Sequence, residues 1–364
     1  MHQETPTRLP MSTVLSHIAV PIVMGLVMAL AYFGGFHKPD PHAVPVAIVG
    51  QAQQVGPVAA QVQLALGDKV AVTTVPDTAS AQDQLRHQKI AGAFVPDAAK
   101  PTLMTASATS ATTTDVVTKI FTAVAAKQGH PLTVQDVVPL GPGDPMGQNG
   151  FFYLVTLSVG AYATAIAIGA AGSTRRFRER LGLILGSTVV LSTAELAIAT
   201  ILFDMFPGHG AEVWGLSALY TATVMAVGVG LHALVGRFST LLFSAMFVAI
   251  NFTSSGGVVQ ASLQPGFFGW LHDFWIGSGF LQVMAHIMYF PDTDVSGAFA
   301  ILIGWLLVGI GALAVSHAVL RRRRRLSVLV ARHDELRRAL HRQRTDGMTE
   351  QQARELELEE DVAV

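Results

Sequence analysis

Few residue types that could do chemistry occur in this chain at the spacings that chemistry needs. The chain has no cysteine, which excludes a thiolate nucleophile, a thiolate metal site and a disulfide. No lysine follows a glycine or precedes a serine or threonine, so the Gly-Lys-Ser/Thr ending of a phosphate loop is absent. No two histidines have the four-residue spacing that binds zinc on one helix face. We therefore expect no enzyme, no metal and no cofactor.

One carboxylate, Glu195, stands in the middle of the apolar run Leu191-Ser-Thr-Ala-Glu-Leu-Ala197. A charged side chain at the centre of a bilayer costs about 3 kcal/mol on insertion scales, so it normally faces other helices or water. Two readings stay open. Glu195 is either a protonated or hydrogen-bonded carboxyl between helices, with Ser192 and Thr193 as companions, or a residue of intramembrane coupling.

A second candidate is a basic run with one aromatic residue in it. It consists of Arg175, Arg176, Phe177, Arg178 and Arg180, between two apolar stretches. Arginines beside an apolar helix contact anionic lipid head groups. The same run could also form a short helix with a docking surface for a partner protein.

The elements that must position these residues are membrane helices. Hydrophobic residues make up 51% of the 364 residues and charged residues only 13%, about half the usual charge of a soluble domain. A bilayer needs roughly 20 apolar residues in a helix. Six stretches qualify, namely Val14 to Phe36, Phe151 to Gly172, Leu183 to Phe206, Leu216 to Gly236, Leu241 to Val259 and Ala300 to Leu320. The first is either a cleaved signal peptide or, as we favour, an uncleaved signal anchor.

The arginines predict the orientation, because basic residues collect in cytoplasmic loops. They lie between the second and third stretches, at Arg237 between the fourth and fifth, and after the sixth, whereas loops 207–215 and 261–299 contain no Lys or Arg. This pattern predicts a multi-pass protein of a bacterial plasma membrane with both termini in the cytoplasm. Residues 1–36 would be the N-terminus and anchor, and 321–364 a basic, then acidic, cytoplasmic tail.

Residues 37–150 read as an exterior α/β domain inserted between the first two membrane helices. Short apolar runs such as Val44 to Gly50 and Val70 to Val75 predict strands, and they alternate with helical spacings such as Asp115 to Lys127. A helix is expected from Ser80, with Ser80 near its cap. Strands alternating with helices favour a layered α/β fold.

Residues 151–320 complete the predicted fold, an α-helical polytopic membrane protein with about six transmembrane helices. The fifth helix is expected to break around Asn251, Gly256 and Gly257. Segment 264–290 is too short for two spans and predicts a re-entrant or interfacial pair of helices on the exterior side.

Three stretches resemble the ABC-2-type transporter permeases, in particular an actinobacterial branch related to phage-infection-protein-like membrane proteins. They are Ala81-Gln-Asp-Gln-Leu85 with Gln88-Lys-Ile-Ala-Gly-Ala-Phe-Val-Pro96, Val138-Pro-Leu-Gly-Pro-Gly-Asp-Pro145 with Phe151-Phe-Tyr153, and Asn251-Phe-Thr-Ser-Ser-Gly-Gly257 with Leu263-Gln-Pro265 and Tyr289-Phe290. The order of elements is similar too, up to about residue 320.

The resemblance implies a membrane permease subunit of an exporter. It implies a second permease copy, as a homodimer or with a related chain, and a separate nucleotide-binding ATPase subunit. It implies no catalytic residue on this chain, and nothing in the chain suggests a nucleic-acid partner. The alternative is a membrane protein without transport activity, such as a scaffold, a secretion accessory or a phage-adsorption protein of the same fold.

Overall fold

The computed structural model describes residues 11–97, 100–127, 129–172 and 175–345. The chain divides into two compact units, residues 1–313 and 314–364. The second unit is described up to Thr345 and continues helix α12 (Ser296–Thr345), with the arginine run 321–325 followed by exposed apolar residues. The predicted acidic end of the tail lies outside the described residues.

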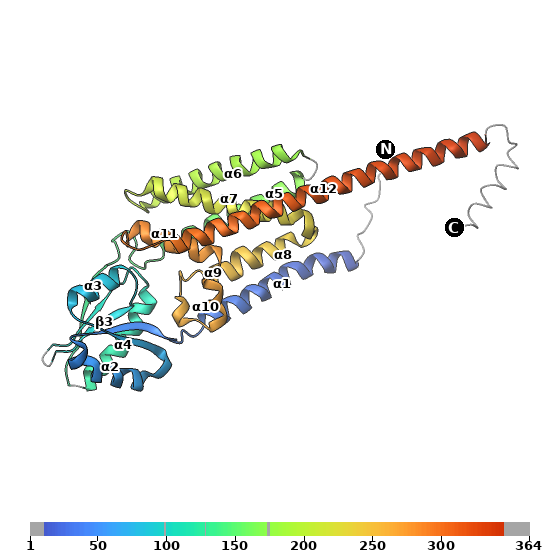
Figure 1. The fold of residues 1–364 in the computed structure, drawn as a ribbon. Helices are drawn as coiled ribbons and strands as arrows, with labels where there is room; N and C mark the ends of the chain where they lie inside the picture. Colours follow the sequence, from blue (N-terminus) through green and yellow to red (C-terminus); the bar gives the residue numbers. More distant parts are fainter. Residues whose placement is uncertain (1–10, 98–99, 128, 173–174, 346–364) are drawn as a thin grey trace. The chain divides into compact units, whose positions relative to one another are not determined.

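Five helical stretches of the described chain are long and apolar enough to cross a membrane (Figure 1). They are α1 (Met11–Phe36), α5 (Asn149–Ala171), α6 (Phe177–Ala197) with its π-helical extension Ile198–Leu202, the stretch Gly210–Ser254, and α12. Few residues of α1 and α6 are buried, and large apolar side chains such as Leu26, Leu30 and Val190 are exposed. Lipid contact explains such a surface, which water would not favour. The protein is therefore a polytopic helical membrane protein.

The stretch Gly210–Ser254 is 45 residues long, about twice what one crossing needs. Its first arm is α7 (Gly210–Val235). Its second arm consists of α8 (Ser239–Ser244), a π-helical segment (Ala245–Ile250) and α9 (Asn251–Ser254). A 3₁₀ turn, Gly236–Phe238, joins the arms, and Gly236 has a φ of 58° that favours glycine. The predicted fourth and fifth spans correspond to these two arms.

The second arm ends at Ser254, five residues before the predicted end of the fifth span. Gly256 follows with a φ of 82°, so the break falls at the predicted glycines. Asn251 does not lie at the break. Its backbone is helical and its side chain is fully buried, which gives it a different role that is described below. After a 3₁₀ turn (Ala261–Leu263), segment 264–290 forms two short helices, α10 (Gly266–His272) and α11 (Ile276–Met288).

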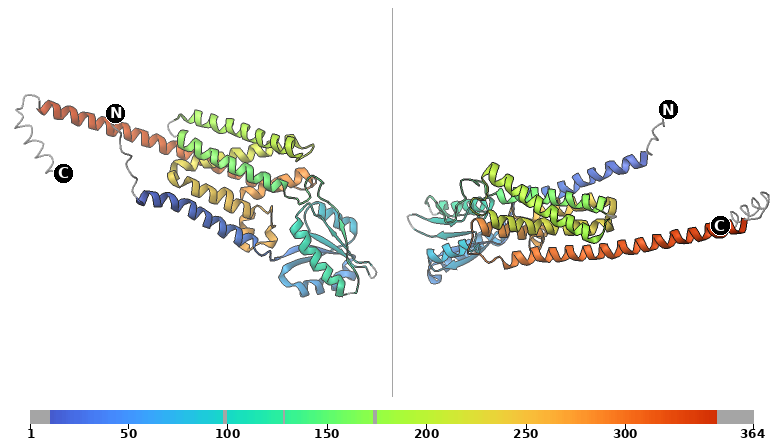
Figure 2. Two further views of the ribbon diagram at one scale, coloured as in Figure 1. Left: turned by 180° about the vertical axis from the view of Figure 1, so that it is seen from behind. Right: turned by 90° about the horizontal axis from the view of Figure 1, so that it is seen from above.

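The α/β domain follows α1 and has a five-stranded sheet of order β2-β1-β3-β4-β5. The strands are β1 (Val44–Val49), β2 (Val70–Val75), β3 (Gly92–Val95), β4 (Thr102–Thr105) and β5 (Thr133–Asp136). All neighbours pair in parallel except β3 and β4. The helices are α2 (Ala52–Leu66), α3 (Thr78–Arg86) and α4 (Ala111–Lys127), and a 3₁₀ turn (Gly67–Lys69) follows α2. The two views of Figure 2 show this domain at one end of the helices of the first unit.

Strand β1 is buried on both faces, as its unbroken apolar sequence predicts. Helices α2 and α4 cover one face, where Phe94 stacks on Phe121 with ring centroids 5.0 Å apart. Helix α3 covers the other face. Each face is completed by residues from far along the chain, Val259 and Leu263 on the first and Phe290 on the second. The core of the α/β domain therefore includes residues from the segments that follow α9 and α11 in the helix bundle.

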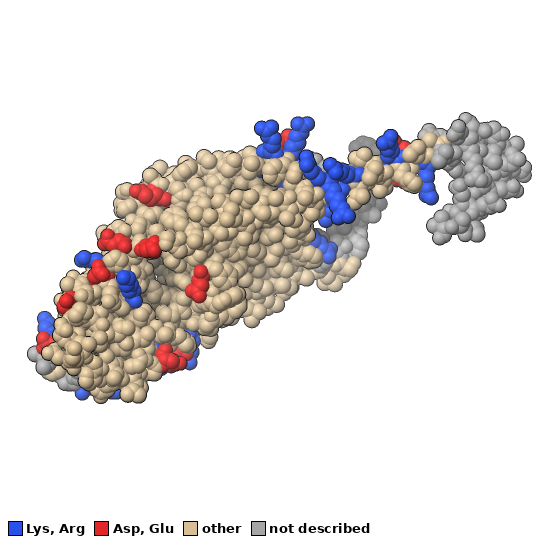
Figure 3. Space-filling view, viewed as in Figure 1, with Lys and Arg blue, Asp and Glu red and all other residues tan. Residues whose placement is uncertain are grey.

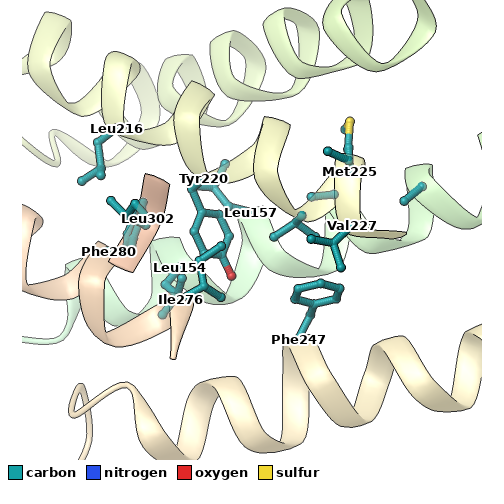
Figure 4. Packing of buried hydrophobic residues seen from close by; sticks show 14 of the residues in the cluster. Leu154, Leu157, Leu216, Tyr220, Met225, Val227, Phe247, Ile276, Phe280 and Leu302 are labelled. Carbon is teal, nitrogen blue, oxygen red and sulfur yellow. The ribbon is translucent and has the colours of Figure 1, made fainter. Parts of the chain in front are cut away.

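The core of the helix bundle joins α5, α6, α7, the second arm, α11 and the start of α12. Figure 4 shows Tyr220 pointing from α7 into this core, between residues such as Leu154 of α5, Phe247 of the second arm and Phe280 of α11. Small residues allow close helix contact. A Cβ at Gly228 of α7 would lie 2.6 Å from the Cβ of Ala165 of α5, so only glycine fits there.

Candidate functional site

A cavity of about 880 Å³ lies where the α/β domain meets the helix bundle. Ligand pockets typically have volumes of ~300–1,000 Å³, so its size suits a small molecule. Its walls come from the segment before β3 and the start of α4 in the α/β domain, the linker before α5, the loop before α7, the break after α9, and α11. The lining residues include Gln88, Ala111, Thr112, Asp144, Met146, Phe151, Asp204, Met205, Phe206, His209, Gly257, Gln260, His272, Asp273, Met284, Met288 and Tyr289.

One wall is fixed by a hydrogen-bonded group at Asp144. Its Oδ1 accepts from the backbone N–H groups of Gln148 and Asn149, at 2.9 and 3.2 Å, and so caps the start of α5. Its Oδ2 accepts from the hydroxyl of Tyr289 at 3.0 Å. Burial and the Asp144 carboxylate raise the pKa of Tyr289, so the phenol keeps its proton. The linker is thereby tied to the end of α11.

The loop between α6 and α7 forms another wall and has an unusual backbone. Asp204 and Phe206 have positive φ values of 51° and 61°. Such conformations cost on the order of 1 kcal/mol or more outside glycine and concentrate at functional sites. The ring of Phe206 is buried and packs against Tyr153 of α5, with centroids 5.1 Å apart. Phe206, which lines the cavity, therefore also packs on one of the polar residues inside the bundle.

Those polar groups form a buried network. Asn251 donates to the Tyr220 hydroxyl at 2.9 Å and to the Ser158 hydroxyl at 3.4 Å, and these two hydroxyls lie 2.6 Å apart. The hydroxyls of Tyr153 and Ser217 lie 3.0 Å apart and link α5 to α7. Such hydrogen bonds hold helices together in a membrane. Asn251 was predicted from the sequence as a helix break, and no role was predicted for Tyr220 or Ser158.

Glu195 lies half-buried on α6 against α5. A Cβ at Gly160 of α5 would lie 3.1 Å from its Oε1, and Thr156, whose hydroxyl donates to the Tyr153 carbonyl at 3.0 Å, lies close to the carboxyl. Its Oε2 is buried and has no hydrogen-bond partner within the described part of the chain. The expected companions were wrong, because Ser192 bonds to Thr221 and Thr193 accepts from Trp214, both on α7. The carboxyl therefore lies between helices, at the α5–α6 contact.

The structure divides the basic run. Arg175, Arg176 and Arg178 are exposed, whereas Phe177 is partly buried against the bundle core. Arg180 is 4% exposed and donates to the carbonyl of Val229 on α7 at 3.2 Å. Two residues along a helix turn by about 200°, so Arg178 and Arg180 face opposite sides. Only the first three arginines present a surface, and Phe177 is not an exposed knob.

Figure 3 shows basic residues at the end of the bundle where α6 begins, while the visible face of the bundle toward the α/β domain carries no Lys or Arg.

No protein-family model, curated protein or solved structure matches the chain.

Proposed function

We propose that this chain is the membrane-spanning permease subunit of an ABC-2-type exporter and works with a separate ATPase. In this proposal the chain crosses the membrane six times, the arms of Gly210–Ser254 counting as two. The α/β domain lies outside the cell, and both termini and Arg175, Arg176 and Arg178 lie in the cytoplasm. The observation that carries the proposal is the cavity of about 880 Å³ between the α/β domain and the bundle. A cavity between an exterior domain and a membrane bundle is a suitable place to receive or release a transported molecule.

The exposed arginines support the ATPase partner. They lie at the start of α6, where Glu179 accepts from the backbone N–H of Arg176 at 3.4 Å and orders the first turn. The ordered first turn of α6, with three exposed cations in it and just before it, is a suitable docking surface for an acidic face of another protein. The same proposal includes a second permease copy and anionic lipids as partners.

Affinity purification of the full chain from its native membrane tests the proposal. We expect an ATPase with a phosphate loop to copurify and to hydrolyse ATP. The variant Arg175→Gln, Arg176→Gln, Arg178→Gln should lose this subunit. Arg332→Gln with Arg337→Gln, exposed in α12, serves as the control and should retain it. A purified chain that is stable and never carries an ATPase would contradict the exporter and favour the scaffold alternative.

The orientation has a separate test, because the chain has no native cysteine. Single cysteines are introduced at three exposed positions, Ser12, Ala79 and Ser327. An impermeant thiol reagent added to intact cells should label only Ala79→Cys, while lysis should expose all three. Labelling of Ser12→Cys or Ser327→Cys in intact cells would contradict the proposed orientation.

A further inference from the structure

We propose that the cavity between the α/β domain and the bundle binds an amphipathic organic cation. The proposal rests on the exporter function above and names the chemical class of its cargo. It follows from three properties of the wall, namely its charge, its apolar surface and its place beside the polar interior of the bundle.

The charge of the wall is of one sign. Asp144, Asp204 and Asp273 line the cavity, and no Lys or Arg is among the described residues that line it. Burial lowers the pKa of the lining His272, which keeps that ring neutral at pH 7. Low-dielectric walls with one sign of charge concentrate ions of the opposite sign. An anionic ligand would find no Lys or Arg among the described lining residues to pair with, whereas a cation finds three carboxylates.

The rest of the wall is apolar and adaptable. Met146, Met205, Met284 and Met288 all line the cavity. Methionine side chains are flexible and polarisable, and they adapt to apolar bodies of different shape. Phe206 and Tyr289 also line the cavity, and aromatic rings attract organic cations. A ligand with an apolar body and a positive charge would use both kinds of wall.

The interior behind the cavity has the same charge preference. Phe206 lines the cavity and packs on Tyr153 of α5, and Glu195 lies against Gly160 of the same helix. Glu195 is the one Asp, Glu, Lys or Arg in the central part of a described membrane helix of the first unit. A carboxylate at that depth accommodates a cation more readily than an anion.

Equilibrium binding to the full chain in phosphatidylcholine nanodiscs tests the proposal. The probes are tetraphenylphosphonium and tetraphenylborate, which have nearly the same shape and opposite charge, and empty nanodiscs give the lipid background. We expect saturable binding of tetraphenylphosphonium only. Tetraphenylborate that binds as tightly would overturn the cation preference, and the absence of saturable tetraphenylphosphonium binding would overturn the site.

Variants locate the binding. Asp204→Asn with Asp273→Asn removes two lining charges and should weaken tetraphenylphosphonium binding by about tenfold. Ala111→Trp fills the cavity from the exposed start of α4 and should weaken it independently. Glu212→Gln with Asp292→Asn removes two carboxylates that do not line the cavity and is the matched control. Binding that is insensitive to both cavity changes would overturn the site.

The assay needs no ATPase, so the two proposals can fail separately. Saturable cation binding without a copurifying ATPase would reject the exporter and keep the site. A chain that copurifies with an ATPase but binds no tetraphenylphosphonium would keep the exporter and reject the site.

Discussion

The hydroxyl of Thr113 donates a hydrogen bond of 2.8 Å to Oε1 of Gln260, although 147 residues separate them in the chain. Thr113 lies on α4 of the α/β domain and Gln260 in the segment that leaves α9. Beside them, Thr112 donates to the carbonyl of Val258 at 3.1 Å. The backbone of Asp40 and His42 bonds to Leu263 and Ser262. The α/β domain is thus attached directly to the end of a membrane helix.

We predict that this attachment stabilises α4. Thr113→Val and Gln260→Leu should each cost about 1 kcal/mol, because each leaves the other partner of a partly buried hydrogen bond unpaired. Hydrogen exchange of the α4 amides, measured by mass spectrometry, should become about fivefold faster. The double variant should cost less than the sum of the two. Thr118→Val on the same helix is the control, and additive effects would contradict the coupling.

The buried network predicts a coupling inside the membrane. Asn251→Leu leaves the hydroxyls of Tyr220 and Ser158 without their amide donor, and Tyr220→Phe removes one acceptor. Each change should lower stability by about 1 kcal/mol, in the range found for hydrogen bonds between membrane helices. Reversible unfolding in mixed detergent micelles measures this. The double variant should cost less than the sum of the two single changes, and a strictly additive loss would show that the Asn251–Tyr220 contact contributes nothing.

Glu195 is predicted to affect coupling rather than folding. Glu195→Gln keeps the hydrogen-bonding capacity beside Thr156 and should leave expression and unfolding unchanged. In the proposed complex with an ATPase, ATP hydrolysis should fall by about fivefold, the low end of allosteric couplings. Glu195→Leu should reduce it further, because leucine removes the carboxyl from the α5–α6 contact altogether. Unchanged hydrolysis in both variants would leave Glu195 with a structural role only.

Asp77 caps the N-terminus of helix α3 in the α/β domain, and we predict that this cap depends on pH. Its carboxylate accepts from the backbone N–H of Ser80 at 2.7 Å, and this hydrogen bond lowers the pKa of Asp77 below its ordinary value of 3.8. A folded-state pKa that is lowered adds stability above the unfolded pKa. That stability is lost as the pH falls through the folded value. Asp77→Ala should therefore melt earlier than the parent at pH 7, and the gap should close well below pH 3.8.

Calorimetry of the solubilised chain at both pH values measures this gap. Asp77→Asn is the matched control, since its side-chain oxygen caps α3 without titrating. It should melt close to the parent at pH 7 and should lack the acid-dependent loss. A gap between Asp77→Ala and the parent that is constant with pH would contradict the carboxylate cap.

Local sequence signals predicted most elements of the fold. The run Val44 to Gly50 is apolar throughout because β1 is buried on both faces, and the structure confirms that strand. The cap of α3 was misplaced from Asp77 to Ser80, because both residue types cap helices and spacing alone does not separate them. The fifth span was predicted to run to Val259, whereas the second arm ends at Ser254, because Val258 and Val259 are apolar without being part of a membrane helix. They pack on the core of the α/β domain.

The candidate site was far less predictable. Its lining comes from separate segments between Pro45 and Tyr289, and no single segment marks a site by itself. The lack of Lys and Arg in loops 207–215 and 261–299 was the available signal, but it was interpreted only as orientation. Arg180 was grouped with its neighbours because sequence proximity says nothing about which helix face is covered. Only the packing of α6 on α7 decides that.

The completion of the α/β core by Val259, Leu263 and Phe290 sets an order for biosynthesis. Strands β1 to β5 leave the ribosome well before these residues are made. The core of the sheet therefore stays incomplete while the later helices enter the membrane. Contacts between parts so distant in the chain form late. The domain reaches its full stability only after the second arm and α11 are in place. If the later helices fail to insert into the membrane, the sheet of the α/β domain keeps an incomplete core with exposed apolar residues. Proteases can recognise such a domain.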